Sequence, residues 1–177
     1  MYPVVEKSVT DPAVEKWASF MPALLVMLAH TKGPVLEVGV GHYSTPVLHA
    51  ICKAECRPLT SLEDNMDWAK RFFDLSDGPE GPHRIAVGNY DDMITDVARS
   101  KWSLAFLDHS PGPRRAQDMS LLSESVDNFI VHDYEGAILQ EFLNRDWPDW
   151  NFVVLNSRQP TTLVASRTLA PMGLTHL

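Results

Sequence analysis

The stretch Val35–Thr45 reads Val-Leu-Glu-Val-Gly-Val-Gly-His-Tyr-Ser-Thr, and it decides the fold of the chain. Its first part is a near-continuous apolar run, which is typical of a parallel strand buried on both faces. Gly39 and Gly41 interrupt the run, and apolar residues at helical spacing follow from Val47 onward. A strand, a glycine turn and a helix in this order form the nucleotide-binding unit of open α/β sheets.

The polar residues of this stretch predict what the turn binds. Glu37 is a carboxylate inside a strand that we expect to be buried, which is costly unless it is hydrogen-bonded or faces a cation. Ser44 or Thr45 can cap the following helix and present a hydroxyl group at its positive end, where a carboxylate on the ligand is also favoured. We therefore expect a ligand that carries a positive charge or several hydrogen-bond donors.

The pattern Glu37-x-Gly39-x-Gly41 resembles the first motif of the class I S-adenosylmethionine (SAM) methyltransferases. The match is partial, because Tyr43 stands where many of those enzymes have a third glycine. The resemblance implies an α/β fold, a Rossmann-like, doubly wound and mostly parallel seven-stranded sheet with a C-terminal antiparallel hairpin. It also implies that the methionine part of SAM is held by Glu37, Gly39, Gly41, Ser44 and Thr45.

Length and composition predict a single domain that spans residues 1–177, with a leading helical segment at 1–31 and a cofactor-binding core at 32–177. The formal net charge of −8 argues against nucleic acid as a partner. The apolar run Met21–Leu28 is too short to span a bilayer, so we expect no membrane partner. Cys52 and Cys56 have a helical separation typical of two buried thiols, which favours a reducing, cytoplasmic location.

Beyond the glycine turn the chain alternates predicted strands and helices. Further parallel strands are expected at Pro58–Glu63, Arg84–Gly88, Ser103–Asp108 and Asn128–Val131, and helices at Asp11–Ala29 (with a break near Pro22), Asn65–Leu75 and Gly136–Arg145. The last two strands, Phe152–Leu155 and Thr162–Ala165, have a connection short enough that only an antiparallel hairpin can join them. A hairpin closing a parallel sheet is a hallmark of the methyltransferase fold, so the resemblance extends over 35–166.

Two strand ends are candidates for the adenosine part of the cofactor. Glu63 ends the second strand about 20 residues beyond the glycine turn, a spacing that suits an acid accepting hydrogen bonds from ribose hydroxyl groups. Asp64 is the less favoured choice and can instead cap the next helix. The resemblance implies that Asn89 and Tyr90 contact adenine; the alternative is a turn in which Asp91 caps the following helix.

Asp108 and Asp133 end strands that should be neighbours in the sheet. Together with the residues beside them, they are similar to the acidic pair of catechol O-methyltransferase, in which Mg²⁺ binds both substrate hydroxyl oxygens, and to the comparable pairs of the sugar and macrolide O-methyltransferases. The resemblance thus implies Asp108 and Asp133 as metal ligands and Mg²⁺ as a second cofactor. Three features depart from it: Tyr134 replaces the amide ligand, His132 replaces a second aspartate of some relatives, and the loop after Asp108 has no lysine.

Without a metal, His109 or His132 is the natural general base, because an unperturbed imidazole titrates near neutral pH. The predicted catalytic set is therefore Asp108, His109, His132 and Asp133, with Asp108 also beside the methyl donor. Each histidine can alternatively make only a structural hydrogen bond at its strand end. Arg114 can pair with Asp118 four residues on, or Arg114 and Arg115 can meet an anionic group of the substrate.

These observations predict SAM-dependent methyl transfer to a small molecule, with an oxygen nucleophile. One alternative is an NAD-binding oxidoreductase, because Gly39-x-Gly41-x-x-Ser44 nearly meets its glycine fingerprint. Another is a non-catalytic SAM-binding module on the same fold. The sequence leaves open the methyl acceptor and the oligomeric state.

Overall fold

A computed structural model describes residues 18–136, 147, 149–156 and 159–169 of the chain. These residues form a seven-stranded sheet in the order β3-β2-β1-β4-β5-β7-β6. Strands β1 to β5 are parallel to one another, whereas β7 runs antiparallel to both β5 and β6. The predicted α/β sheet with a terminal antiparallel hairpin is therefore confirmed. The strands are β1 (Val35–Val38), β2 (Leu59–Glu63), β3 (His83–Val87), β4 (Leu104–Leu107), β5 (Asn128–Val131), β6 (Asn151–Leu155) and β7 (Thr162–Ser166).

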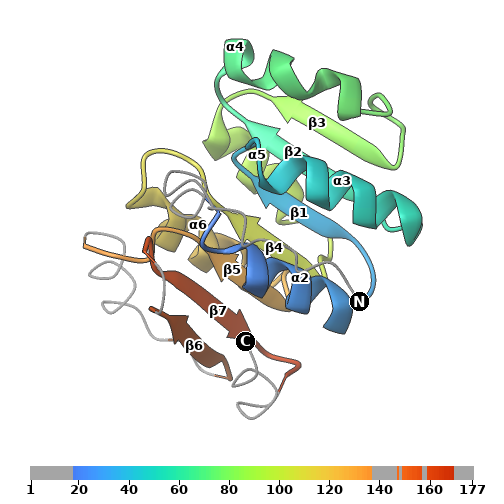
Figure 1. Ribbon diagram of the computed structural model, residues 1–177. Helices are drawn as coiled ribbons and strands as arrows, with labels where there is room; N and C mark the ends of the chain where they lie inside the picture. Colours follow the sequence, from blue (N-terminus) through green and yellow to red (C-terminus); the bar gives the residue numbers. More distant parts are fainter. Residues whose placement is uncertain (1–17, 137–146, 148, 157–158, 170–177) are drawn as a thin grey trace, which may run out of the picture.

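Helices cover both faces of the sheet (Figure 1). Helices α2 (Met21–His30) and α3 (Ser44–Ala54) lie on one face, and α5 (Tyr90–Val97) and α6 (Arg114–Leu122) on the other. A short helix α4 (Met66–Ala69) continues into the 3₁₀ helix η1 (Lys70–Leu75). Because parallel strands need crossover connections, the helices that join them form the two outer layers.

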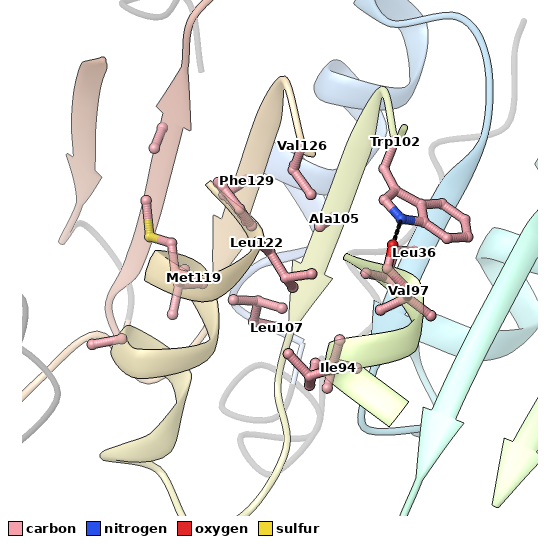
Figure 2. Close-up of a cluster of buried hydrophobic side chains, with 14 of the residues drawn as sticks. Leu36, Ile94, Val97, Trp102, Ala105, Leu107, Met119, Leu122, Val126 and Phe129 are labelled. Carbon is pink, nitrogen blue, oxygen red and sulfur yellow. Dashed lines mark hydrogen bonds between the residues drawn. The ribbon is translucent and has the colours of Figure 1, made fainter. Parts of the chain in front are cut away.

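Alternation along β1 divides the buried side chains between two cores. Leu36 and Val38 point into the cluster formed with α5 and α6, whereas Val35 points into the cluster formed with α2 and α3. Figure 2 shows the first cluster, in which the indole N–H of Trp102 donates to the carbonyl oxygen of Val97. The side chain of Glu37 shares the face of Val35, so the strand places a carboxylate beneath α3.

Several predicted boundaries differ from those in the structure. The described part of the first helix begins at Met21, one residue before Pro22, because proline is tolerated only in the first turn. The predicted helix Asn65–Leu75 is split into α4 and η1. The helix expected at Gly136–Arg145 lies outside the described residues beyond Gly136, as does the part of the leading helix before Ala18.

The capping residues also differ from those expected. Neither Ser44 nor Thr45 caps α3, because the helix begins at Ser44 itself and Tyr43 precedes it without a side-chain cap. The side chain of Asn65, and not that of Asp64, caps α4 by accepting from the backbone N–H groups of Asp67 and Trp68. Each of these helix starts is thus shifted by a residue or so from the position that local polarity predicted.

The two cysteines have different surroundings. Cys52 is buried, and burial raises the pKa of its thiol to about 11. Cys56 is exposed, at a backbone φ of 54° just beyond the end of α3, so the expectation of two buried thiols is wrong for Cys56. Within the described ranges, no helix has both the length and the apolar composition that crossing a bilayer requires.

Candidate functional site

A cavity opens at the carboxyl ends of the parallel strands. The order of the strands reverses between β1 and β4, which is where open α/β sheets form a ligand crevice. This cavity has a volume of about 660 Å³, and a smaller one of about 320 Å³ shares Asp64, Tyr90 and Ser110 with it. The larger cavity is lined by Gly39, Val40, Gly41, Ser44, Glu63, Trp68, Tyr90, Asp108, His109, Arg115, His132 and Asp133, among others.

Gly39 holds the first turn against the loop that follows β4. Its backbone φ is +91°, and a Cβ atom placed there would lie 2.8 Å from the backbone N and Cα of His109. Only glycine avoids both the strained backbone and this clash. The glycine is therefore required by the protein's own packing, in addition to lining the cavity as predicted.

Glu37 lies directly behind the cavity wall. It is wholly buried and accepts hydrogen bonds from the hydroxyl groups of Ser61 (2.6 Å) and Thr45 (3.0 Å). Burial raises the pKa of Glu37 to about 7, against the lowering effect of hydrogen bonds from Ser61, Ser44 and Thr45. Glu37 and Thr45 are not among the residues that line the cavity, whereas Ser44 is. A ligand in the cavity would therefore meet Ser44 first, with the carboxyl group of Glu37 behind it.

Glu63 reaches the cavity directly from the end of β2. One carboxyl oxygen accepts from the backbone N–H of Val40 (3.2 Å) and the other from that of Asn65 (3.0 Å). Burial raises the pKa of Glu63 despite these two backbone hydrogen bonds. Each oxygen of a carboxylate can accept more than one hydrogen bond, so Glu63 keeps acceptor capacity for a ligand.

The two residues predicted to contact adenine both line the smaller cavity, and only Tyr90 also lines the larger one. Asn89 lines only the smaller cavity, and its side-chain oxygen caps α5 by accepting from the N–H of Asp91 (2.7 Å), so Asn89 makes the cap that Asp91 was considered for. Tyr90 lines both cavities. The Tyr90 ring packs 4.8 Å from the ring of His109, and burial raises the pKa of its hydroxyl group.

Asp108 and Asp133 are brought together as predicted, and a guanidinium group lies between them. Nη2 of Arg115 is 3.2 Å from Oδ1 of Asp108, and Nη1 is 3.1 Å from Oδ2 of Asp133. The two aspartate side chains are 26% and 39% exposed, so their carboxylates reach the cavity. Asp133 has a backbone φ of +50°, an uncommon conformation for a residue other than glycine and one that clusters at functional sites.

Both ring nitrogens of His132 have partners within the protein. Ser19 donates its hydroxyl hydrogen to the carbonyl oxygen of Pro160 (2.7 Å), and Nε2 of His132 lies 2.9 Å from Oγ of Ser19. Nδ1 of His132 lies 3.1 Å from Oδ1 of Asp108. The side chain is 2% exposed, so His132 has no ring nitrogen directed at open cavity and instead orients Asp108.

The imidazole of His109 points away from the cavity into the interface with α6. Its Nε2 lies 2.7 Å from Oδ2 of Asp118, and the side chain is 0% exposed. Asp118 also accepts from Nε of Arg114 (2.8 Å), which confirms the predicted pair four residues apart. Nδ1 of His109 is buried and has no hydrogen-bond partner among the residues that the structure describes. The structure therefore places His109 next to the site mainly through its backbone, which packs on Gly39.

The predicted metal ligands lie close together but are already engaged with other groups. Atoms of Asp108, His132 and Asp133 lie within 4.8 Å of one another, which is close enough for a shared ion. One oxygen of each aspartate, however, already contacts Arg115, and Nδ1 of His132 faces Asp108. A divalent cation there would meet an adjacent positive charge, which disfavours its binding. The donor set therefore does not fit a metal in this arrangement.

Some residues of the site were not predicted. From the sequence, Arg115 was considered only as a contact for a substrate anion. Its position near a helix N-terminus, where the helix dipole disfavours a cation, already suggested that Arg115 needs an anionic partner within the protein. Ser19 and Phe20 come from the segment before α2, and the Phe20 ring packs against His132 with centroids 4.9 Å apart. Trp68 lines the cavity and donates its indole N–H to the carbonyl oxygen of Val40 (2.7 Å). None of these three contacts has a sequence signal, because each depends on segments far apart in the chain.

Solved structures of methyltransferases match this fold. The O-methyltransferase TomG from Streptomyces achromogenes, solved in complex with SAM, is 16% identical, with 92% of this chain and 82% of that chain covered at a TM-score of 0.62. The Podospora anserina methyltransferase PaMTH1, bound to S-adenosylhomocysteine (SAH), is 13% identical, with 94% and 97% covered and a TM-score of 0.63. An O-methyltransferase from Bacillus cereus in complex with SAH is 13% identical, with 93% and 83% covered and a TM-score of 0.60.

No protein-family model matches the sequence, and no curated protein does. At these identities the solved structures establish the fold. The chain has the fold of the class I SAM-dependent methyltransferases, with the cavity at the switch point of the sheet and acidic side chains at the ends of β2, β4 and β5.

Proposed function

We propose that the chain is a SAM-dependent methyltransferase that acts on an oxygen atom of a small molecule. The observation that carries the proposal is the order of polar groups around one cavity: Ser44 backed by Glu37, then Glu63, then the pair Asp108 and Asp133. Three neighbours with this fold have SAM or SAH in their structures. The NAD-binding alternative finds no support among these neighbours.

The cofactor's parts are assigned from the chemistry of the lining residues. The hydroxyl oxygen of Ser44 keeps lone pairs for the methionine ammonium group, and the negative potential of Glu37 lies behind it. The free acceptor capacity of Glu63 suits the two ribose hydroxyl groups. The smaller cavity, with Tyr90 on one wall and Asn89 at its rim, suits adenine. Gly39 and Gly41 line the larger cavity.

SAM, when bound, supplies an electrophilic methyl group on a sulfonium. The chain's own task is to align the acceptor oxygen and to remove its proton. Asp133 is our candidate for the proton acceptor, because its carboxylate is the more exposed of the pair while both imidazoles are buried. Asp108 faces the methyl donor, and His132 and His109 act as positioning residues. The methyl acceptor and the cytoplasmic location stay predictions, and the Mg²⁺ implied by the resemblance is left out of this proposal because the donor set does not fit it.

Isothermal titration calorimetry with SAM, SAH and NAD tests the cofactor assignment. We expect saturable binding of SAM and SAH and none of NAD. Replacing Glu63 with Gln should weaken SAM binding by about 1–3 kcal/mol, the range for hydrogen bonds to charged groups. Glu80→Gln, at an exposed position remote from the cavity, is the matched control and should bind SAM as the unmodified chain does. Binding of NAD without binding of SAM would refute the proposal.

Turnover is measured as SAH release in a screen of hydroxylated small molecules. Asp133→Asn should retain SAM binding and lose most of the turnover, because the amide cannot accept the proton. A chain that binds SAM tightly yet releases no SAH with any acceptor would instead support the non-catalytic alternative.

A further inference from the structure

Arg115 makes four contacts at the carboxyl ends of the parallel strands, two with backbone carbonyl groups and two with carboxylates. Its Nε donates to the carbonyl oxygen of His109 (2.8 Å), and its Nη1 donates to that of His132 (2.6 Å). The same guanidinium contacts Asp108 through Nη2 and Asp133 through Nη1. The loops after β4 and β5 are thus fastened to one side chain of α6.

This guanidinium is fixed and permanently charged. The side chain of Arg115 is 6% exposed, and two of its partners are backbone carbonyl groups, which hold it independently of the aspartates. An arginine stays protonated throughout the physiological pH range, and its planar fork suits two carboxylates at once. The charge between Asp108 and Asp133 is therefore built into the fold.

The residue that replaces the amide ligand of the metal-dependent relatives supplies no such ligand here. Tyr134, which stands where the amide ligand of the metal-dependent relatives would be, is buried in the hydrophobic cluster under α6. A divalent cation bound by Asp108 and Asp133 would have to approach a guanidinium that contacts both of them, and like charges at such distances repel strongly in a partly buried site.

We propose that Arg115 takes the place of a divalent cation at the acidic pair, so that Asp108 and Asp133 are held in position for the acceptor by a guanidinium group and bind no metal. The proposal rests on the function proposed above for this cavity. It assigns Arg115 as a positioning residue that no sequence motif had indicated.

Manganese binding, measured by electron paramagnetic resonance and by calorimetry, tests the inference without any turnover. The unmodified chain should show no saturable Mn²⁺ site. Arg115→Met should gain one. Its affinity for Mn²⁺ should be at least about tenfold tighter than any residual Mn²⁺ binding by the unmodified chain, because the repelling charge is gone while both carboxylates remain. In the double variant Arg115→Met, Asp133→Asn that site should be lost. The matched control is Arg114→Met, which removes the neighbouring arginine and should gain no Mn²⁺ site, since Arg114 pairs with Asp91 and Asp118.

Two results would overturn the inference: an Mn²⁺ site in the unmodified chain that Asp133→Asn removes, or a folded Arg115→Met variant that gains none. Circular dichroism reports folding, and if Arg115→Met does not fold, Arg115→Gln serves in its place, because it removes the charge and keeps hydrogen-bonding capacity. If both variants fail to fold, the unmodified chain alone tests the inference: a saturable Mn²⁺ site there would contradict it, and the absence of such a site would support it. Calorimetry with SAM is run separately, so failure to bind SAM refutes the proposed function and leaves the metal result readable.

Discussion

The carboxyl group of Glu37 is wholly buried, and its hydroxyl partners do not fully offset the cost of removing it from water. Ser61, Ser44 and Thr45 all donate to it, yet its pKa is still raised from 4.5 to about 7. The fold therefore places a carboxyl group that is costly to ionise directly behind the wall of the cavity. A ligand ammonium group near Ser44 would favour the ionised form, so we expect the burial cost to be linked to cofactor binding.

The raised pKa of Glu37 predicts a specific pH dependence of stability. Below about pH 4.5 both the folded and the unfolded chain hold the proton, and Glu37 has no effect. Between pH 4.5 and about 7 the unfolded chain loses the proton while the folded chain keeps it, so the free energy of unfolding falls. The loss reaches about 3 kcal/mol at pH 7 and is constant above it.

Urea unfolding of the unmodified chain and of Glu37→Gln, at pH 4.5 and pH 8, measures this effect. The difference in stability between the two should shift by about 3 kcal/mol in favour of Glu37→Gln at the higher pH. Glu80→Gln, which changes an exposed carboxylate, should show no such shift. A pH-independent difference between Glu37→Gln and the unmodified chain would contradict the buried, protonated carboxyl group.

Helix α6 is the element that assembles the site. Asp118, Arg114 and Arg115 project from its first turns, and they reach His109, Asp91 and the pair Asp108 and Asp133. The helix therefore fastens the loops after β4 and β5 to each other and to α5.

Asp118→Asn tests how far α6 depends on its buried carboxylate. The change leaves His109 without its charged partner and Arg114 with only the exposed Asp91, so the free energy of unfolding should fall by about 1.5–3 kcal/mol, as for hydrogen bonds to charged groups. Asp91→Asn removes only the exposed ion pair of Arg114, and it should lower the free energy of unfolding by less than about 0.5 kcal/mol. Equal losses from the two changes, measured by denaturant unfolding, would show that Asp118 does not anchor the helix.

In the whole molecule, the carboxyl ends and the amino ends of the parallel strands have different roles. The carboxyl edge holds the cavity and the acidic groups, and Arg115 crosses it. Near the amino edge, the buried Arg57 donates to the carbonyl oxygens of Leu28 and Gly33 and to the hydroxyl oxygens of Thr31 and Ser103. These contacts join α2, β1 and β4 at the end away from the cavity, so we assign Arg57 to stability.

Arg57→Met should therefore separate stability from binding. We expect the free energy of unfolding to fall by about 3–5 kcal/mol, the cost of removing one partner from a buried polar network. SAM affinity, measured by calorimetry below the unfolding temperature, should not change. Arg99→Met, which breaks a surface pair with Asp96, should alter neither quantity by more than about 0.5 kcal/mol. A loss of SAM affinity in folded Arg57→Met would show that the two edges are coupled.

The sequence by itself determined the sheet and its order of elements. Hydrophobic runs, the glycine turn after Val38 and the short connection before Thr162 are local signals, and backbone geometry converts them into strands, a turn and a hairpin. The proximity of Asp108 and Asp133 also followed, because adjacent parallel strands end at the same edge. The positions of Glu63 and Ser44 at the cavity were predicted on the same ground.

Only the tertiary structure decided what surrounds those residues. It placed Arg115 between the two aspartates, turned His109 toward Asp118, and brought Ser19 against His132. Each of these contacts joins segments whose relative position is set by packing of helices on the sheet, and side-chain direction at such junctions has no local signal in the sequence. The sequence therefore determined which chemical groups meet at the cavity, and packing decided which of them stay open to a ligand and which are occupied by one another.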